Sequence, residues 1–250
     1  MIRILLCGAN GKMGHVIASC VAERGNMEIV AGIDLNTQTY GAFPIYRDFD
    51  SCDKEADVII DFSHPNNLDD ILAYAKKNKT KVVFATTGFS KKELDKIEEA
   101  SKEIAIFQSY NTSFGIQMVT KILRQVAKEF YDNGYDIEIL EKHHNKKLDA
   151  PSGTAVMIAN GVKEVLPDSE YVYGRHGRSD KRNSNEIGIH AVRCGTIVGE
   201  HTTIFAGHDE VVEIKHTAQS KDIFAKGSIE AAKFLVKQEA GYYNMNNMLG

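Results

Sequence analysis

Three glycines, each three residues after the last, stand directly behind the first apolar run of the chain. The run covers residues 2–7, the glycines are Gly8, Gly11 and Gly14, and apolar residues then recur at helical spacing over residues 16–21. Such a turn lets the backbone come close to a pyrophosphate and lets the following helix pack near the strand. This order of strand, glycine turn and helix predicts the first unit of a doubly wound parallel sheet.

The same alternation continues to about residue 112. Further strands are expected at residues 28–33, 57–62, 81–85 and 104–107, with helices at residues 65–77 and 90–102. Ser90 and Glu93 form the sequence signature of a capping box at the start of the second helix. Strands that alternate with helices indicate an α/β fold with a Rossmann-type doubly wound parallel sheet.

The pattern changes after Asn111. Helices are expected at residues 116–126 and 153–165, a long loop at 167–186, and strands at 136–140, 187–198, 202–206 and 211–217. Because no helix separates the last three strands, we expect them to pair mainly as an antiparallel meander. This predicts a second, α+β domain over residues 113–220 with a mixed, largely antiparallel sheet. A last helix at 223–238 returns the chain, so residues 1–112 and 221–250 would form the dinucleotide-binding domain.

Charge, hydropathy and cysteine spacing exclude several classes of protein. The net charge is −4, whereas a nucleic-acid binder is usually basic. The sequence has neither a signal-peptide layout nor an apolar run that could span a bilayer, so a cytoplasmic protein is expected. Cys7, Cys20, Cys52 and Cys194 lack metal-ligand spacing, and all but Cys52 lie in apolar strand-like or helix-like runs. We therefore expect buried thiols, a reducing compartment and no metal site.

The glycine turn and an acidic residue downstream form a candidate dinucleotide site. N–H groups of the turn and the dipole of the helix start can hold phosphates, and Asp34, 20 residues after Gly14, can accept hydrogen bonds from ribose hydroxyls. The spacing GxxGxxG varies the usual motif, and a turn that serves geometry alone is the alternative. Leu35 and Asn36 offer no cation to a 2′-phosphate, although Lys12 could assist. NADH is therefore expected to serve at least as well as NADPH.

Two short segments are expected to line the nicotinamide. Ala85, Thr86 and Thr87 follow one strand of the first domain, and residues 109–112 follow the next strand along the chain. Ligands of such sheets bind at the carboxyl ends of the strands, close to the point where the strand order reverses. Ordinary turn chemistry is the alternative for each segment.

Positive charge, proton donors and a helix start are concentrated in residues 141–155, whose sequence is EKHHNKKLDAPSGTA. The side chains that matter are His143, His144, Lys146 and Lys147, followed by Ser152, Gly153 and Thr154 at the helix start. Free N–H groups and hydroxyls at a helix N-terminus suit a carboxylate, and nearby cations suit a dianion. A histidine can supply a proton near neutral pH, and a lysine can balance developing charge. A solvated basic loop before a capped helix is the alternative, and the lysines disfavour a metal site.

These segments together resemble the dihydrodipicolinate reductase family over nearly the whole chain. The matching sequences are GANGKMG at 8–14, DFSHP at 61–65, ATTGF at 85–89, EKHHNKKLDAPSGTA at 141–155, IGIHAVR at 187–193 and VGEHT at 198–202. The resemblance implies NAD(P)H-dependent reduction of a small cyclic dicarboxylate, (hydroxy)tetrahydrodipicolinate, to tetrahydrodipicolinate in lysine and diaminopimelate biosynthesis. It also implies two domains joined by hinges, the second of which binds the substrate and assembles a homotetramer.

The resemblance also implies roles for individual residues. His143 would be the proton donor or acceptor and Lys147 a second proton donor. His144, Gly153 and Thr154 would contact the substrate carboxylates. The residues implied to contact the cofactor are Gly8, Ala9, Asn10, Gly11, Lys12, Met13, Asp34, Ala85, Thr86, Thr87, Ser109, Tyr110, Asn111, Thr112, Lys221 and Phe224. Lys221 is a departure, because the family often has arginine there.

Two other functions remain open from the sequence. An NAD(P)-dependent dehydrogenase of the homoserine or sugar type would share the two-domain architecture but would not need the cationic cradle. A nucleotide-sensing regulator would bind the dinucleotide without turnover. Residues outside these motifs receive structural interpretations: His190, His201 and His216 are expected to be packed or hydrogen-bonded, and the basic loop of Arg175, Arg178, Lys181 and Arg182 to be solvated.

Overall fold

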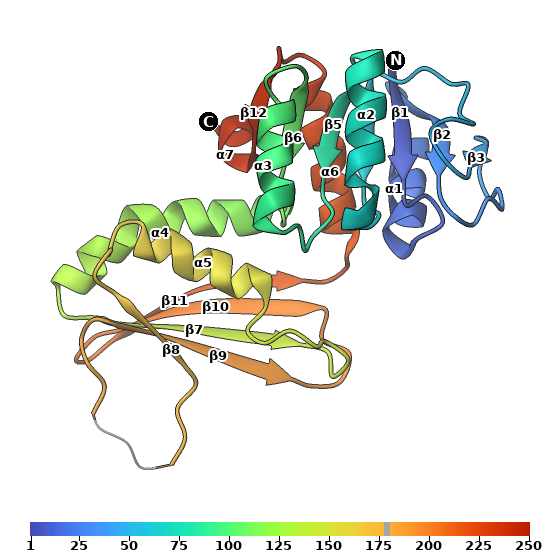
Figure 1. Ribbon diagram of the computed structural model, residues 1–250. Helices are drawn as coiled ribbons and strands as arrows, with labels where there is room; N and C mark the ends of the chain where they lie inside the picture. The colour runs from blue at the N-terminus through green and yellow to red at the C-terminus, as the bar shows by residue number, and fades with distance from the viewer. Residues whose placement is uncertain (178–180) are drawn as a thin grey trace. The chain divides into compact units, whose positions relative to one another are not determined.

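The computed structural model describes residues 1–177 and 181–250 (Figure 1). These residues divide into two compact units: the first comprises residues 1–113 and 222–250, and the second comprises residues 114–221. Arg178 of the expected basic loop lies outside the described residues. Within the described part of the chain, every helix is too short or too polar to cross a lipid bilayer.

The first unit is built on a seven-stranded sheet in which the paired strands are parallel. In spatial order the strands are β12 Gly241–Tyr243, β6 Ala105–Gln108, β5 Lys81–Phe84, β4 Val58–Asp61, β1 Ile2–Cys7, β2 Met27–Ile33 and β3 Ile45–Tyr46. The helices are α1 Lys12–Ala22, the 3-10 turn η1 Pro65–Asn67, α2 Leu68–Asn78, α3 Lys91–Ala100, α6 Asp222–Leu235 and α7 Met245–Leu249. The predicted doubly wound parallel sheet is confirmed.

Alternation along the strands divides the apolar side chains of this sheet between two layers. Ile4 and Leu6 of β1 pack with α1 and α6, whereas Leu5 and Cys7 pack with α2 and α3. Figure 1 shows α2 and α3 in front of the strands and α6 behind them. Because both faces are covered, the carboxyl ends of the strands are the edge at which a ligand can approach.

Two short strands of this sheet were not predicted. β3 has two residues and β12 has three, which is too few for a periodicity to be seen in the sequence. β12 pairs with β6, and α7 follows it, so α6 ends at Leu235 and not near residue 238. The predicted capping box of Ser90 and Glu93 is present at the start of α3.

The second unit is a five-stranded mixed sheet with two helices packed on one face (Figure 1). In spatial order the strands are β11 Val211–Ala218, β10 Gly199–Ala206, β7 Asp136–His143, β9 Glu186–Arg193 and β8 Glu170–Tyr173, and the helices are α4 Phe114–Asp132 and α5 Gly153–Lys163. Ile137, Ile139 and Phe205 of the sheet pack against Leu123 of α4 and Ile158 of α5.

The strand order of the second sheet corrects the expected meander. β10 and β11 are antiparallel neighbours, but β9 lies beside β7, parallel to it, and not beside β10. The cause is α5, because a helical crossover from β7 brings the chain back in the same direction. β8 lies in the stretch expected to be a loop and pairs parallel with β9. The described strands thus make two parallel and two antiparallel pairings.

Two expectations about exposed and buried side chains in this unit were wrong. Cys194 is exposed, because β9 ends at Arg193. Cys7, in the first unit, is buried as expected. All four cysteines are free thiols. Arg182, expected to be solvated, donates to Glu138 at 2.9 Å, and Glu138 also accepts from His190 at 2.6 Å. Arg182 is therefore fixed to the sheet through the acidic side chain of Glu138 on β7.

Candidate active site

The glycine turn of the first unit requires glycine at two of its three glycine positions. Gly8 has a φ of +77°, and a Cβ on it would lie 2.7 Å from the carbonyl oxygen of Phe62. A Cβ on Gly14 would lie 2.2 Å from the carbonyl oxygen of Ala9. The N-cap of α1 is Gly11, which has no side chain and therefore makes no side-chain capping bond. The uncapped N–H groups and the dipole of this helix start are directed to the carboxyl edge of the sheet, where they suit a phosphate.

Asp34 is tied to the glycine turn by hydrogen bonds. Its Oδ2 accepts from the N–H of Asn10 at 2.9 Å, and its Oδ1 accepts from the N–H of Asn36 at 3.0 Å. The side chain of Asn10 in turn donates to the carbonyl oxygen of Gln38 at 3.0 Å. Each carboxylate oxygen keeps one acceptor position, so Asp34 can still receive ribose hydroxyls.

A cavity of about 490 Å³ lies over the glycine turn. Gly8, Gly11 and Asp34 line it, together with Arg47 and His64. The sequence did not point to Arg47, because a cation that binds a 2′-phosphate is expected directly after Asp34. β3 pairs with β2 and so brings Arg47 to the carboxyl end of the sheet, but a strand of two residues leaves no periodicity in the sequence that could have revealed this.

The segments expected beside the nicotinamide follow β5 and β6 directly. Ala85 and Thr86 are buried, whereas Thr87 is exposed. In the next segment the Ser109 hydroxyl donates to the carbonyl oxygen of Asn111 at 2.8 Å, and Tyr110 is 51% exposed. Residues other than these line the 490 Å³ cavity.

The chain leaves and re-enters the first unit at adjoining points. The Thr112 hydroxyl donates to the carbonyl oxygen of Phe224 at 2.7 Å, and a Cβ on Gly227 would lie 1.8 Å from the carbonyl oxygen of Thr112. Phe224 is half-buried, and Lys221 is exposed. The two connections to the second unit are therefore fixed side by side on the first.

In the second unit a buried carboxylate joins three elements. Glu141 on β7 has no exposed surface and accepts from Arg193 on β9 through two bonds of 2.7 Å. It also accepts from Nδ1 of His143 at 2.6 Å and from the N–H of Ser152 at 2.9 Å. Burial alone would raise the pKa of Glu141, but the bonds from Arg193, His143 and Ser152 outweigh it and lower the pKa.

His143 is buried at the end of β7 with its Nδ1 held by Glu141. Burial lowers its pKa; Glu141 opposes this change, and the charges of Lys147 and Arg193 add to it. The net direction is downward, which favours the neutral imidazole, and in that form the contact is a hydrogen bond donated by Nδ1 to Glu141. The other nitrogen, Nε2, lies beside Gly199, where a Cβ would be 3.0 Å away.

The start of α5 is anchored to the same cluster. Ser152, the N-cap, is buried; its hydroxyl accepts from the N–H of Ala155 at 3.1 Å and contacts Nε2 of His201 at 2.8 Å. Burial, with a smaller contribution from His143, lowers the pKa of His201 to about 3. Gly153 is exposed, and a Cβ on it would meet no atom within 4 Å. The helix start therefore faces open space at Gly153, while its N-cap, Ser152, is fixed by its contact with the buried His201.

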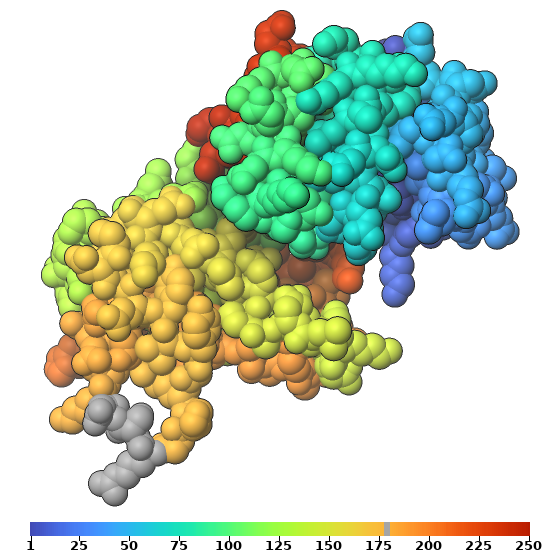
Figure 2. All heavy atoms as spheres, in the orientation of Figure 1, coloured from blue at the N-terminus to red at the C-terminus, as the bar shows by residue number. Residues whose placement is uncertain are grey.

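The loop between β7 and α5 carries the remaining cations. Figure 2 shows this loop, in yellow-green, on the surface of the second unit, and Leu148 within it is 99% exposed. Lys147 pairs with Asp149 at 2.9 Å, whereas Lys146 is exposed. His144 is half-buried, and its Nδ1 has no hydrogen-bond partner among the residues that the structure describes.

Sequence reasoning missed the residues that support His143. Glu141 was quoted within its segment without a role, and Arg193 and Gly199 were left without one. His201 was expected to be packed or hydrogen-bonded, which it is. The signal was the alternation of β7, because Glu141 takes the buried position that continues from Ile139. A carboxylate at such a position must have partners.

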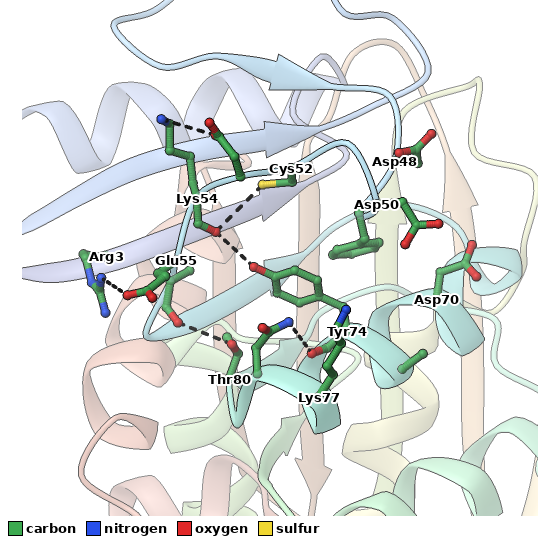
Figure 3. A pocket seen from close by; sticks show the side chains of 15 residues that line it. Arg3, Asp48, Asp50, Cys52, Lys54, Glu55, Asp70, Tyr74, Lys77 and Thr80 are labelled. Carbon is green, nitrogen blue, oxygen red and sulfur yellow. Dashed lines mark hydrogen bonds and ion pairs between the residues drawn. The ribbon is translucent and has the colours of Figure 1, made fainter.

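A larger hollow of the first unit, about 650 Å³, lies between α2 and the loop of residues 48–56 (Figure 3). Its charged lining residues are Arg3, Asp48, Asp50, Asp53, Lys54, Glu55, Asp70 and Lys77. Many polar groups there satisfy one another: Arg3 pairs with Glu55 at 3.3 Å, and the Tyr74 hydroxyl donates to the carbonyl oxygen of Lys54 at 3.0 Å. Its lining includes no residue predicted to bind cofactor or substrate. The predicted chemistry therefore belongs to the smaller cavity and to the second unit.

Two family models match the chain and together cover almost all of it. The model described as dihydrodipicolinate reductase, N-terminus, matches residues 2–112, and the model described as dihydrodipicolinate reductase, C-terminus, matches residues 115–249.

Full-length relatives agree with these matches. The chain is 51% identical to the 4-hydroxy-tetrahydrodipicolinate reductase of Caldanaerobacter subterraneus subsp. tengcongensis over 250 residues, which are 100% of this chain and 98% of the relative. It is 48% identical to the enzyme of the same name from Clostridium tetani, over 100% of this chain and 97% of the relative.

Solved structures show the same fold. A dipicolinate-bound dihydrodipicolinate reductase from Paenisporosarcina sp. TG-14 superposes with a TM-score of 0.82 at 25% identity, covering 99% of each chain. A probable dehydrogenase from Thermotoga maritima has a TM-score of 0.62 at 12% identity, covering 99% of this chain and 92% of its own, a likeness of fold alone. The chain therefore belongs to the dihydrodipicolinate reductase family and, as a member with a Rossmann-type sheet, is an oxidoreductase that uses a nicotinamide cofactor.

Proposed function

We propose that this protein reduces the ring of (hydroxy)tetrahydrodipicolinate to tetrahydrodipicolinate in lysine and diaminopimelate biosynthesis. The names of the relatives and the dipicolinate held by the Paenisporosarcina structure support this substrate class. The observation that carries the proposal is the arrangement in the second unit, where His143 is held through Nδ1 by Glu141 and the open helix start of α5 rests on the same carboxylate.

The first unit fits a dinucleotide cofactor. The positive φ of Gly8 and the close approach at Gly14 form a cradle that a Cβ would fill. Residues 8–13 would hold the pyrophosphate, Asp34 the ribose hydroxyls, and residues 85–87 and 109–112, with Lys221 and Phe224, the nicotinamide half. When bound, the reduced nicotinamide supplies the hydride.

The second unit would hold the two carboxylates of the substrate. Gly153 and Thr154 at the start of α5 would present N–H groups to one carboxylate, favoured by the helix dipole. His144 and Lys147 would add donors and positive charge from the loop. The hydroxyl of Ser152 is already engaged with His201 and Ala155, so we assign Ser152 to holding the helix start, and its predicted contact with substrate stays a prediction.

The hydroxy substrate would lose water to give the dihydrodipicolinate ring, and His143 would deliver the proton that follows hydride addition to that ring. Its pKa is lowered in the free protein. A bound dianion favours the charged imidazole and therefore raises that pKa, so substrate binding and proton uptake are coupled. Lys147 would balance the negative charge that develops on the ring and act as a second donor.

We propose that both cofactors are used and that NADH serves at least as well as NADPH. The Asp34 carboxylate faces the cavity where the adenosine ribose would lie and repels a 2′-phosphate. Arg47 lines the same cavity and supplies a cation that attracts one. The two charges oppose each other, which favours a modest preference over strict selectivity.

We further propose a homotetramer assembled through the second unit. α4 and α5 cover one face of its sheet. The other face carries apolar side chains that stay accessible, with Val192 39% and Val211 58% exposed. Sheet faces of this kind are commonly covered by a second copy of the chain. Sedimentation equilibrium would give the mass of the oligomer.

The expected cytoplasmic location stays a prediction.

The test of the reaction is a coupled assay. Dihydrodipicolinate synthase would generate the substrate in place, and loss of NADH absorbance would be followed. Turnover with this substrate and none with homoserine is expected. Turnover with homoserine alone would favour the dehydrogenase alternative, and cofactor binding without consumption of NADH by either substrate would favour a regulator.

A further inference from the structure

Strand β7 places a carboxylate where its pattern calls for an apolar side chain. Residues 137, 139, 141 and 143 alternate with half-buried residues, and the first two, Ile137 and Ile139, pack under the helices. The third is Glu141, with no exposed surface. A charge at such a position is retained only if it is paired and fully hydrogen-bonded.

The partners of Glu141 divide between its two oxygens. Oε2 accepts from Nδ1 of His143 and from Nη1 of Arg193, and Oε1 accepts from Nη2 of Arg193 and the N–H of Ser152. Three of these four donors cannot accept a hydrogen bond, because an arginine and a backbone N–H only donate. The imidazole of His143 is the one partner that could reverse its role by moving its proton to Nε2.

We propose that Glu141 is a positioning residue that fixes the proton of neutral His143 on Nδ1, so that the bare Nε2 faces the substrate and takes up the proton to be delivered. This inference rests on the proposed role of His143 in the reaction. By holding Ser152 through its N–H, the same carboxylate sets the height of the α5 start against the imidazole. Glu141 thereby links the proton donor and the carboxylate cradle in one rigid group.

The charged and titratable groups around His143 support this assignment. Glu141 holds Nδ1, while Lys147 and Arg193 bring positive charge to the same imidazole. His201 on β10 packs edge-on at 5.1 Å between ring centroids. Glu141 is the one negative charge among them, and its loss leaves only groups that disfavour protonated His143.

Replacement of Glu141 by glutamine tests the proposal. An amide NH2 placed at Oε1 would oppose both Ser152 and Arg193, whereas at Oε2 it opposes only Arg193 and can donate to His143. We therefore expect Nδ1 of His143 to become an acceptor and its proton to move to Nε2. The expected loss in kcat is roughly 100-fold or more, the size seen when a catalytic histidine is held in the wrong tautomer or an acid is removed. The KM for NADH should stay within about twofold, because the cofactor cradle lies in the first unit.

Two readouts separate positioning from a general structural role. Nitrogen-15 shifts of histidine rings, with His143 assigned by its absence in His143→Ala, should show the Nδ1–H form in the wild type and the Nε2–H form in Glu141→Gln. The limb of the pH profile of kcat/KM that reports His143 should move to lower pH in Glu141→Gln. A loss of packing alone would move neither.

Glu164→Gln is the matched control. Glu164 on the surface of the same unit accepts two bonds from Arg124, of 2.6 and 2.9 Å, and so offers an arginine–carboxylate pair with two bonds but without a histidine. The kcat of Glu164→Gln should stay within about twofold of the wild-type value, and its histidine shifts should equal those of the wild type.

The outcomes distinguish this inference from the proposed function. If His143→Ala is inactive while Glu141→Gln keeps near-normal kcat, the positioning role is wrong and the reaction stands. If His143→Ala is fully active, the proton-donor role falls, and the positioning role with it. A double variant that loses no more than His143→Ala alone supports action through His143, and a multiplied loss contradicts it. Should Glu141→Gln fail to fold, the wild-type shifts decide: an Nε2–H form overturns the proposal.

Discussion

The candidate cofactor site and the candidate substrate site are made of different materials. In the first unit the cradle consists of backbone: a glycine at φ +77°, a close approach at Gly14 and an uncapped helix start. In the second unit it consists of side chains from three strands and a helix, gathered around Glu141. The first is therefore sensitive to an added methyl group, and the second to the loss of a charge or a proton.

The largest expected effect tests the chemistry of the side-chain site. His143→Ala and Lys147→Ala should each lower kcat by roughly 100-fold or more, because each removes a group that delivers a proton or balances negative charge. NADH binding, measured by fluorescence titration, should not change. Lys128→Ala is the control: this lysine is an exposed cation on α4 that pairs with Asp132, and kcat of the variant should stay within about twofold. Near-normal turnover in both active-site variants would show that the chemistry lies elsewhere.

Acid should destabilise the side-chain site through His201. His201 has a pKa lowered to about 3, against 6.5 when unfolded, so it is neutral in the folded protein. Between these values the unfolded chain binds the extra proton, and stability is lost as pH falls, by about 1.4 kcal/mol per pH unit. The contribution is fully retained above pH 6.5.

His201→Gln removes this titration while keeping a polar atom near Ser152. Between pH 6.5 and about pH 5 the wild type should lose about 2 kcal/mol more unfolding free energy than the variant, measured by urea unfolding of the second unit. Equal losses in both proteins would mean that His201 is protonated in the folded state.

A single methyl group should damage the backbone site. Gly8→Ala places a Cβ 2.7 Å from the carbonyl oxygen of Phe62 at a φ that costs about 1–2 kcal/mol for other residues. The Kd for NADH should rise about tenfold or more, as calorimetry would show. Gly25→Ala is the matched control in the same unit, because its Cβ would meet no atom within 4 Å. An unchanged Kd for Gly8→Ala would remove the glycine turn from the cofactor site.

The same difference in materials explains what the sequence could predict. The parallel sheet and the glycine turn follow from local patterns, since each βα unit repeats a strand, a turn and a helix. The order of the second sheet did not follow, because proximity in sequence suggested that β9 pairs with β10. The crossover through α5 decided otherwise.

The second site was predicted only in part for a related reason. His143, Lys147 and the start of α5 lie within one segment and were found together. Arg193 meets Glu141 only because β9 lies parallel to β7, with His143 and Arg193 as cross-strand partners. No sequence spacing encodes that neighbourhood. A buried acidic residue within a strand pattern was the one available sign.

Arg47 gives the smallest expected effect and the sharpest question about the backbone site. Its side chain is exposed, so water and salt weaken its attraction for a 2′-phosphate. Arg47→Ala should lower kcat/KM for NADPH by roughly threefold to tenfold and leave the value for NADH within about twofold, measured at low ionic strength.

The control for Arg47 is Lys77→Ala. Lys77 is an exposed cation on α2 that lines the larger hollow and not the cofactor cavity, so its loss should change neither value. Equal losses for both cofactors would mean that Arg47 contacts the shared part of the dinucleotide, and discrimination would then rest on Asp34 alone. In that case Asp34→Asn, which removes the repelling charge, should still raise kcat/KM for NADPH relative to NADH. The single amide oxygen of the variant can accept from the N–H of Asn10 or from that of Asn36, and its NH2 leaves the other N–H without an acceptor.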